Sequence, residues 1–200
     1  LLPMEATVLC PSRLPAALQR LGNSKAWQQV MAHLNGVDTR QRPLVVWGPT
    51  GCGKTCGVKD LAASMRYRLM ELDGSDGDDT DQLLTWIKRA RDGKALRGPT
   101  AVLLDDYESF TDDARKRIAT MLAGTAATHR TRLGPIVITC TQLRDPQMKD
   151  MQAFAHVRLF APHPQVCREW FDRNGILVEK VRDGQLIVLR SPAGPGWSAR

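Results

Sequence analysis

Short runs of apolar residues recur along the chain, and polar residues do not alternate with apolar ones inside them. Such runs are typical of strands that are buried on both faces of a sheet. We predict five strands, at residues 44–47, 68–72, 101–104, 135–140 and 156–160. Between the strands, apolar residues recur at helical spacing. The alternation predicts an α/β fold, a five-stranded parallel sheet with helices on both faces.

Three helices are predicted from the spacing of apolar residues after the first three strands. Their inward-facing positions are Val58, Leu61, Ala62 and Met65, then Leu83, Leu84, Ile87 and Ala90, then Ile118, Met121 and Leu122. The stretch 73–81 contains five aspartates and no apolar residue. Its spacing does not match the ligand pattern of an EF-hand, so we expect a solvated loop there.

The pattern changes after residue 165. Residues 166–172 are expected to form a short helix. Two β-rich runs, 175–181 and 185–189, flank the dipeptide Asp183-Gly184, which is typical of a tight hairpin turn. Residues 191–200 are rich in proline and glycine and are expected to form a flexible tail.

The composition is that of a globular protein. A chain of 200 residues with 42% hydrophobic and 24% charged residues has room for one good-sized domain or two small ones. This composition excludes three classes of protein: a disordered tail, a collagen-like fibre and a coiled-coil rod. No apolar run approaches the ~20 residues that span a bilayer, so no membrane-embedded role is expected. Residues 1–5 lack the features of a secretory signal, and the absence of an initial methionine favours a fragment or a processed product.

The formal net charge is +7, and the excess of basic residues lies toward the two ends of the chain. Basic ends agree with a protein that contacts nucleic acid. Solubility alone explains a moderate charge equally well. The five cysteines form no C-x-x-C pair and no zinc pattern, which indicates a reducing compartment, the nucleus or the cytoplasm.

Residues 48–55 match the phosphate-loop pattern G-x-x-x-x-G-K-[ST] after a strand and before a helix. Glycines let the backbone wrap around phosphate oxygens, and the following helix adds its positive end. Lys54 is expected to contact the β- and γ-phosphates, and the Thr55 hydroxyl to reach Mg²⁺. The candidate nucleotide-binding residues of this loop are Gly48, Pro49, Thr50, Gly51, Cys52, Gly53, Lys54 and Thr55.

Two acids follow the predicted strand at 101–104. We expect Asp105 to hold Mg²⁺, directly or through water, and Asp106 to orient and activate the attacking water. A solvated turn is the alternative for such a pair. The apolar run before the acids and the phosphate loop upstream favour the nucleotide site.

Four short motifs also occur in order along the chain. They are Leu21-Gly22-Asn23, Glu71-Leu72-Asp73-Gly74-Ser75-Asp76, Asp105-Asp106-Tyr107-Glu108 and Ile136-Val137-Ile138-Thr139-Cys140-Thr141. They resemble the Gly-Asn box, the E-[LF]-N-A-S-D segment, the D-E-x-D acids and the sensor-1 strand of AAA+ ATPases of the sliding-clamp loader type. The resemblance covers roughly residues 10–165 and is closest to the large subunits of replication factor C.

The resemblance implies a P-loop NTPase core that binds ATP and Mg²⁺ between neighbouring subunits of a ring or spiral. It places Leu21 and Gly22 near the adenine. It gives Thr141 the sensor-1 role of hydrogen-bonding the γ-phosphate or the attacking water, so the implied catalytic residues are Lys54, Asp106 and Thr141. The implied partners are other AAA+ subunits, DNA held through its phosphates, and a sliding clamp.

Three departures from the family's pattern bear on catalysis. Asp106 stands where the family has glutamate and is one methylene shorter, so turnover is expected to be slow. Ala153 stands where small loader subunits carry an arginine finger, which favours a hetero-oligomer. Arg144 and Arg158 are either substitutes for that finger or solvated surface residues. The stretch after Phe160 is expected to replace the family's helical lid with a short helix and a hairpin.

The expected organisation is an N-terminal segment with the Gly-Asn box (1–30), an AAA+ core (31–165), an appendage (166–190) and a flexible tail (191–200). The leading hypothesis is an ATP-binding and ATP-hydrolysing subunit that acts on DNA within a hetero-oligomer. One alternative is a nucleotide-dependent assembly subunit with little catalysis. Another is a different DNA motor on the same core, a helicase loader or a viral packaging ATPase.

Overall fold

The computed structural model describes residues 22–36, 42–91, 99–124, 134–163, 165–166, 169, 177–182 and 185–190. These residues belong to two compact units. The first unit holds the described residues from Asn23 to Ala161, and the second holds Gly22 together with those from Pro162 onward.

The first unit is built on a parallel sheet with the strand order β2-β3-β4-β1-β5. The strands are β1 (Leu44–Trp47), β2 (Arg68–Leu72), β3 (Thr100–Leu104), β4 (Ile136–Cys140) and β5 (Ala155–Arg158). Every residue of β3 and β4 is buried, as expected for interior strands covered on both faces. The five-stranded parallel sheet predicted from the apolar runs is confirmed.

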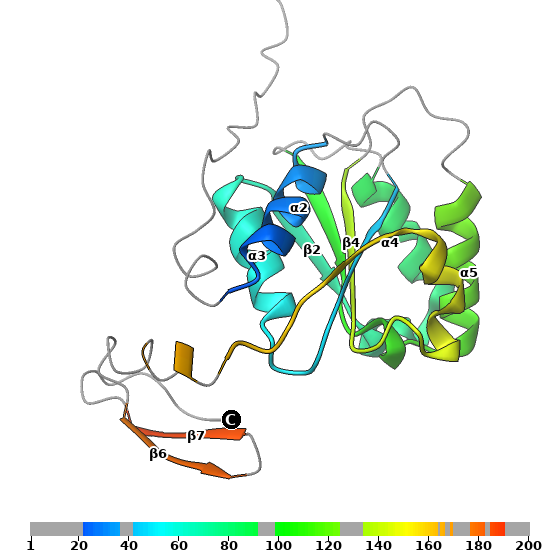
Figure 1. The fold of residues 1–200 in the computed structure, drawn as a ribbon. Helices are drawn as coiled ribbons and strands as arrows, with labels where there is room; N and C mark the ends of the chain where they lie inside the picture. The colour runs from blue at the N-terminus through cyan, green and yellow to red at the C-terminus, as the bar shows by residue number, and fades with distance from the viewer. Residues whose placement is uncertain are drawn as a thin grey trace, which may run out of the picture. The chain divides into compact units, whose positions relative to one another are not determined.

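Helices cover both faces of this sheet, which confirms the second part of the fold prediction. On one face lie α2 (Ser24–Leu34) and α3 (Lys54–Ser64), and on the other lie α4 (Thr80–Arg91) and α5 (Asp112–Gly124), as Figure 1 shows. Side chains along each strand alternate between the two resulting core layers. Val45 belongs to the layer beneath α4 and α5, whereas Val46 belongs to the layer beneath α2 and α3.

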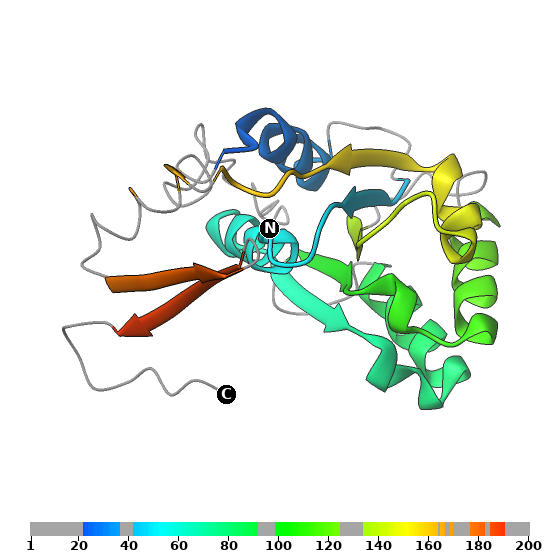
Figure 2. The ribbon, with the colours of Figure 1, turned by 60° about the horizontal axis from the view of Figure 1, so that its bottom comes forward.

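Helix α2 is an element that the apolar pattern did not lead us to predict. It lies beside β5 and α3 (Figure 2). Its buried side chains are Trp27, Val30 and Leu34, and the partly buried Ala26 and Met31 pack against the same core layer. Trp27, Val30, Met31 and Leu34 follow the spacing of an amphipathic helix. The Trp27 ring packs directly on Gly57 of α3, where a Cβ atom would lie 2.1 Å from the ring. Close packing against α3 therefore adds to the stability of this amphipathic helix.

The acidic stretch 73–81 is not the loop we expected. Residues Gly74–Asp78 form a short 3₁₀ helix, η1, and α4 begins at Thr80. The Asp73 carboxylate accepts hydrogen bonds from the backbone and the hydroxyl of Ser75, and the Asp76 carboxylate accepts one from the Asp73 backbone. Aspartates that satisfy neighbouring N–H groups can order a segment without burying apolar surface.

The second unit contains the predicted hairpin. Strands β6 (Leu177–Arg182) and β7 (Gln185–Arg190) pair antiparallel, and Asp183-Gly184 between them lies outside the described residues. Of the expected helix at 166–172, residues 166 and 169 are described, and both are helical. The expected tail, 191–200, lies outside the described residues. No helix in the described part of the chain is long and apolar enough to cross a membrane.

The contact between α2 and α3 generates a prediction about stability. An alanine in place of Gly57 should raise helix propensity by about 1 kcal/mol, but its methyl group must displace the Trp27 ring. We expect Gly57→Ala to lower the free energy of unfolding by about 1–3 kcal/mol, measured by urea denaturation. Cys56→Ala, at the exposed neighbouring position, should change it little. A Gly57→Ala variant as stable as the parent would contradict this packing.

Candidate nucleotide-binding site

The phosphate loop connects the end of β1 to the start of α3, at the carboxyl edge of the sheet. The Gly48 N–H donates to the Cys140 carbonyl at 3.2 Å. A Cβ atom on Gly48 would lie 2.4 Å from the Leu159 carbonyl oxygen, so only glycine fits between β4 and β5 here. The sheet thus holds the start of the loop from both sides.

Lys54 is the first residue of α3, and its side chain folds back over the loop. Its Nζ donates to the carbonyl oxygens of Gly48 at 2.8 Å and Pro49 at 3.1 Å. Gly53 caps the helix in the left-handed region, with φ of 89°. A lysine ammonium and the first N–H groups of a helix converge on one small loop, which is an arrangement suited to an anion.

Asp105 joins the phosphate loop to the central strands. Its Oδ1 accepts hydrogen bonds from the hydroxyl of Thr55, at 2.7 Å, and from the hydroxyl of Thr139, at 2.6 Å. The Thr139 hydroxyl oxygen in turn accepts from the Asp106 N–H at 2.9 Å. The structure therefore brings together Thr55 and Asp105, the two predicted metal ligands, 50 positions apart in the chain.

The donor set at this point suits Mg²⁺ bound to a nucleotide. Thr55 and Asp105 offer one hydroxyl and one carboxylate, and Mg²⁺ commonly takes few protein ligands and completes its shell with phosphates and water. The described residues contain no cluster of three or more His, Cys, Asp or Glu side chains suited to a metal. The charge of a magnesium ion held here would offset that of the phosphates.

Asp106 lies at the start of the 3₁₀ turn η2 (Tyr107–Ser109), with φ of 48° in the left-handed region. Its carbonyl accepts hydrogen bonds from the backbone and the hydroxyl of Ser109, both at 2.7 Å. Partial burial raises the pKa of the Asp106 carboxyl, and the negative charges of Glu108 and Asp105 raise it further. The turn therefore gathers carboxylates that a cation would stabilise.

Glu108 is a residue of this site to which the sequence reasoning assigned no role. Its Oε1 accepts hydrogen bonds from the backbone N–H groups of Thr141 and of Gln142, the latter at 3.4 Å. Its Oε2 is buried and meets no hydrogen-bond donor among the described residues. Glu108 thus ties the loop that carries Thr141 to the acidic turn. Its place in the four-residue motif 105–108 was the available signal.

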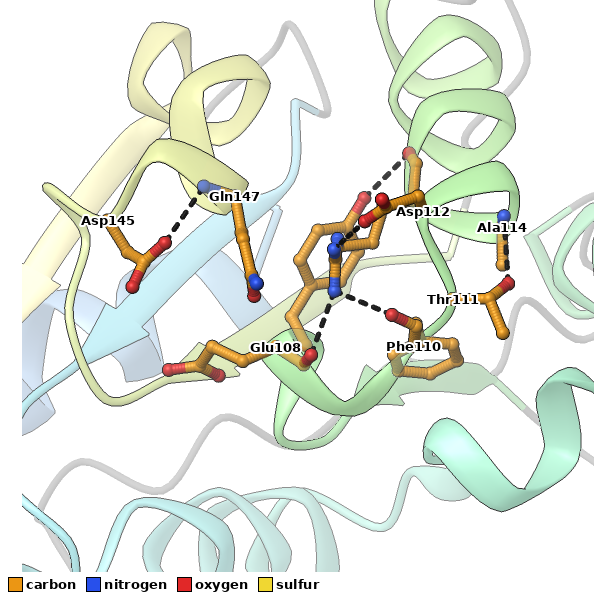
Figure 3. A network of polar contacts seen from close by, with 9 residues as sticks. Glu108, Phe110, Thr111, Asp112, Ala114, Asp145 and Gln147 are labelled. Atoms are coloured by element: carbon orange, nitrogen blue, oxygen red, sulfur yellow. Dashed lines mark hydrogen bonds and ion pairs between the residues drawn. The ribbon is translucent and has the colours of Figure 1, made fainter.

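A buried arginine bonds to the backbone around the acidic turn, and Figure 3 shows three of its partners, Glu108, Phe110 and Asp112. Arg115 of α5 is only 8% exposed. Its guanidinium donates to the carbonyl oxygens of Glu108, at 2.8 Å, and Phe110, at 2.6 Å, and pairs with the Asp112 carboxylate. The Tyr107 hydroxyl donates to the Arg115 carbonyl at 2.9 Å. These bonds fix the backbone on which the Glu108 side chain stands.

A cavity of about 960 Å³ lies beside the phosphate loop. It is lined by Trp47, Gly48, Pro49, Thr50, Thr141, Gln142, Leu143, Arg144, Gln152, His156 and Arg158. Two arginines and a histidine line it, and none of these lining residues is acidic. It therefore provides Thr141 and the loop with a shared, positively charged space.

Two predicted residues are not placed against this site. Leu21 lies outside the described residues, and Gly22 belongs to the second unit, so their contact with adenine stays a prediction. Asn23, the third residue of the same motif, lies at the start of α2. Its side-chain amide forms two hydrogen bonds with the backbone of Phe160, each 2.9 Å long.

Known proteins resemble this chain both in sequence and in fold. Replication factor C large subunit from Methanococcus maripaludis strain C5 is 24% identical over 115 residues, which cover 56% of this chain and 23% of that protein. The same subunit from Pyrococcus abyssi is 26% identical over 116 residues, covering 56% and 24%. The chain thus spans about a quarter of the length of these relatives.

Among solved structures, a lysine-to-arginine mutant of RuvB from Thermotoga maritima superposes with a TM-score of 0.57 at 12% identity. The match covers 78% of this chain and 51% of that one, and shows a shared fold. Residues 44–160, more than half of the chain, match the family described as ATPase family associated with various cellular activities (AAA). This match contains the phosphate loop, the acids after β3 and strand β4. The chain therefore belongs to the AAA family of ATPases.

Proposed function

We propose that this protein is an ATP-binding and ATP-hydrolysing AAA+ subunit that acts on DNA within a hetero-oligomer of the clamp-loader kind. The observation that carries the proposal is the hydrogen bond between Thr55 and Asp105, 2.7 Å long. It joins the phosphate loop to the acid at the end of β3, the two halves from which a nucleotide and Mg²⁺ would be held. The similarity to replication factor C large subunits supports the clamp-loader part.

In this proposal, the eight residues from Gly48 to Thr55 bind the phosphates of ATP. Lys54 exchanges its two carbonyl acceptors for the β- and γ-phosphate oxygens, which are stronger acceptors because they are charged. Thr55 and Asp105 hold Mg²⁺, which supplies positive charge next to the phosphates. Leu21 and Gly22 contact the adenine.

Hydrolysis requires a water molecule held in line with the terminal phosphate. We assign its activation to Asp106 and its hydrogen bonding, or that of the γ-phosphate, to Thr141. Glu108 positions Thr141 relative to Asp106 through its bond to the Thr141 N–H. Because the Asp106 carboxylate is one methylene shorter than a glutamate, turnover is slow.

The partners of the proposed function are other AAA+ subunits, DNA and, within that assembly, a sliding clamp. Ala153 lies exposed at the end of the 3₁₀ segment η4 (Pro146–Ala153), so this position offers no arginine to a neighbouring subunit. A hetero-oligomer fits that observation better than a homo-oligomer. The net charge of +7 supports contact with DNA phosphates. We place the protein in the nucleus or cytoplasm, and Cys52, Cys56 and Cys140 are free thiols.

A second candidate function is a nucleotide-dependent assembly subunit with little catalysis. Two residues favour this second candidate: Asp106, which stands in the place of a glutamate, and Ala153, which stands in the place of an arginine finger. The two candidates share ATP binding and differ in whether Asp106 affects turnover.

The binding part of the proposal is tested by Lys54→Ala. Removing the ammonium should weaken ATP binding more than about tenfold, because charge-assisted hydrogen bonds to the phosphates are lost. Isothermal titration calorimetry measures the affinity. Lys59→Ala is the matched variant, since Lys59 lies on the same helix and pairs with Glu71 at the surface. An unaltered protein that binds no ATP at millimolar concentration would refute the proposed function.

The catalytic part is tested by lengthening and by removing the acid at position 106. Asp106→Glu should raise turnover by about tenfold to a hundredfold by bringing the carboxylate closer to the attacking water. Asp106→Ala should abolish turnover and preserve binding. Steady-state phosphate release, with DNA and partner subunits present, reports both. If neither variant changes the rate, the assembly subunit is the better account.

Glu108 gives a prediction that separates positioning from charge. Glu108→Gln keeps a carbonyl oxygen for the Thr141 N–H, whereas Glu108→Ala removes it. We expect the alanine variant to lose about tenfold more turnover than the glutamine variant, with ATP affinity almost unchanged in both. Equal losses in the two variants would mean that the Glu108 charge matters and its hydrogen bond does not.

A further inference from the structure

Arg158, the last residue of β5, contacts two aromatic rings. Its guanidinium carbon lies 4.8 Å from the centre of the Trp47 ring and 4.7 Å from that of Phe160. Both distances are within the range of cation–π attraction. Arg158 forms no ion pair with any residue that the structure describes. Its charge is therefore positioned by stacking and is not neutralised by a carboxylate.

The backbone of Phe160, one of the two aromatic residues beside Arg158, is itself held by hydrogen bonds. The Asn23 side chain donates to the Phe160 carbonyl and accepts from the Phe160 N–H, as a neighbouring strand would. Phe160 is nevertheless 58% exposed, unusual for a large apolar side chain in this unit. An exposed ring with a fixed backbone is well suited to hold the arginine in place, and burial does not explain its position.

The end of β5 is in direct contact with the phosphate loop. The Leu159 N–H donates to the Trp47 carbonyl at 2.8 Å, and Gly48 packs against the Leu159 carbonyl. Arg158 also lines the same cavity as Pro49, Thr50 and Thr141. An ordered, unpaired cation therefore faces a space that begins at the phosphate loop and has no acidic lining residue.

We propose that Arg158 binds the terminal phosphate of the nucleotide from within the same chain. In a nucleoside triphosphate complex, the γ-phosphate would occupy the cavity between Arg158 and the phosphate loop. In a nucleoside diphosphate complex, Arg158 would have no phosphate to bind. The stacked guanidinium keeps its N–H groups free at its edge to donate to phosphate oxygens. This inference rests on the proposed function, because it assigns part of the same nucleotide site.

The test compares the affinities of a non-hydrolysable ATP analogue and of ADP. In Arg158→Gln the affinity for the analogue should fall about tenfold or more, while that for ADP changes less than about threefold. Arg158→Lys keeps the charge but not the flat stacked group. Its affinity for the ATP analogue should lie between that of the unaltered protein and that of Arg158→Gln. The affinity of Phe160→Ala for the analogue should also lie between those of the unaltered protein and Arg158→Gln. Arg68→Ala removes an exposed arginine from β2, at the opposite edge of the sheet, and should change neither affinity.

The outcomes separate the two proposals. If the unaltered protein binds neither nucleotide, the proposed function fails. If it binds both, and Arg158→Gln and Arg158→Lys weaken both equally or neither, the role of Arg158 is overturned. Loss of binding to a single-stranded oligonucleotide, with nucleotide affinities unchanged, would also overturn it and assign the arginine to nucleic acid. Thermal unfolding of each variant identifies any that does not fold, and the lysine variant then decides.

Discussion

The site depends on one carboxylate oxygen, Oδ1 of Asp105. It accepts hydrogen bonds from Thr55 on the helix after the phosphate loop and from Thr139 on β4. Three segments that are distant in sequence thereby converge on one atom. Because two hydroxyl donors already share it, its direction is fixed before any ligand arrives. The remaining groups of the site take their places relative to this junction: Asp106 follows it in the chain, and the Asp106 N–H bonds to the same Thr139 hydroxyl.

The arrangement around this junction also concentrates charge of both signs. Asp105, Asp106 and Glu108 stand within four consecutive positions after β3, and their mutual repulsion contributes to the raised pKa of Asp106. Arg115 does not relieve this repulsion directly, because it bonds to backbone carbonyls and to Asp112. Positive charge from Arg144 and Arg158 lines the cavity beside the phosphate loop. A magnesium nucleotide would carry both signs in a matching order, with the cation toward the acids and the phosphates toward the basic cavity.

Local patterns in the sequence predicted the sheet, most helices and the phosphate loop, because each depends on residues adjacent in the chain. The parts that sequence reasoning missed depend on distant contacts. In the sequence, Thr139 is simply a β-branched residue of a buried strand. Only the fold shows that its hydroxyl donates to Asp105. From the sequence, Arg115 would be expected on the surface, because it lies in a polar turn of its helix. In the structure it is buried, and its guanidinium donates to the Glu108 carbonyl. Helix α2 carries an apolar stripe at helical spacing that we overlooked, whereas the packing of Trp27 on Gly57 depends on the fold.

The strand order has a consequence for how the protein is made. Strand β1 carries the phosphate loop, yet both strands that pair with it, β4 and β5, come later in the chain. On the ribosome, the loop sequence would emerge well before the strands that fix its start. Strand β1 therefore has no sheet partner until β4 has been synthesised, and it lacks its second partner until residue 158, a period in which unpaired strand surface is open to aggregation. Assembly of the nucleotide site is thus one of the last events in folding this unit, and nucleotide present at that stage would stabilise the folded chain as it forms.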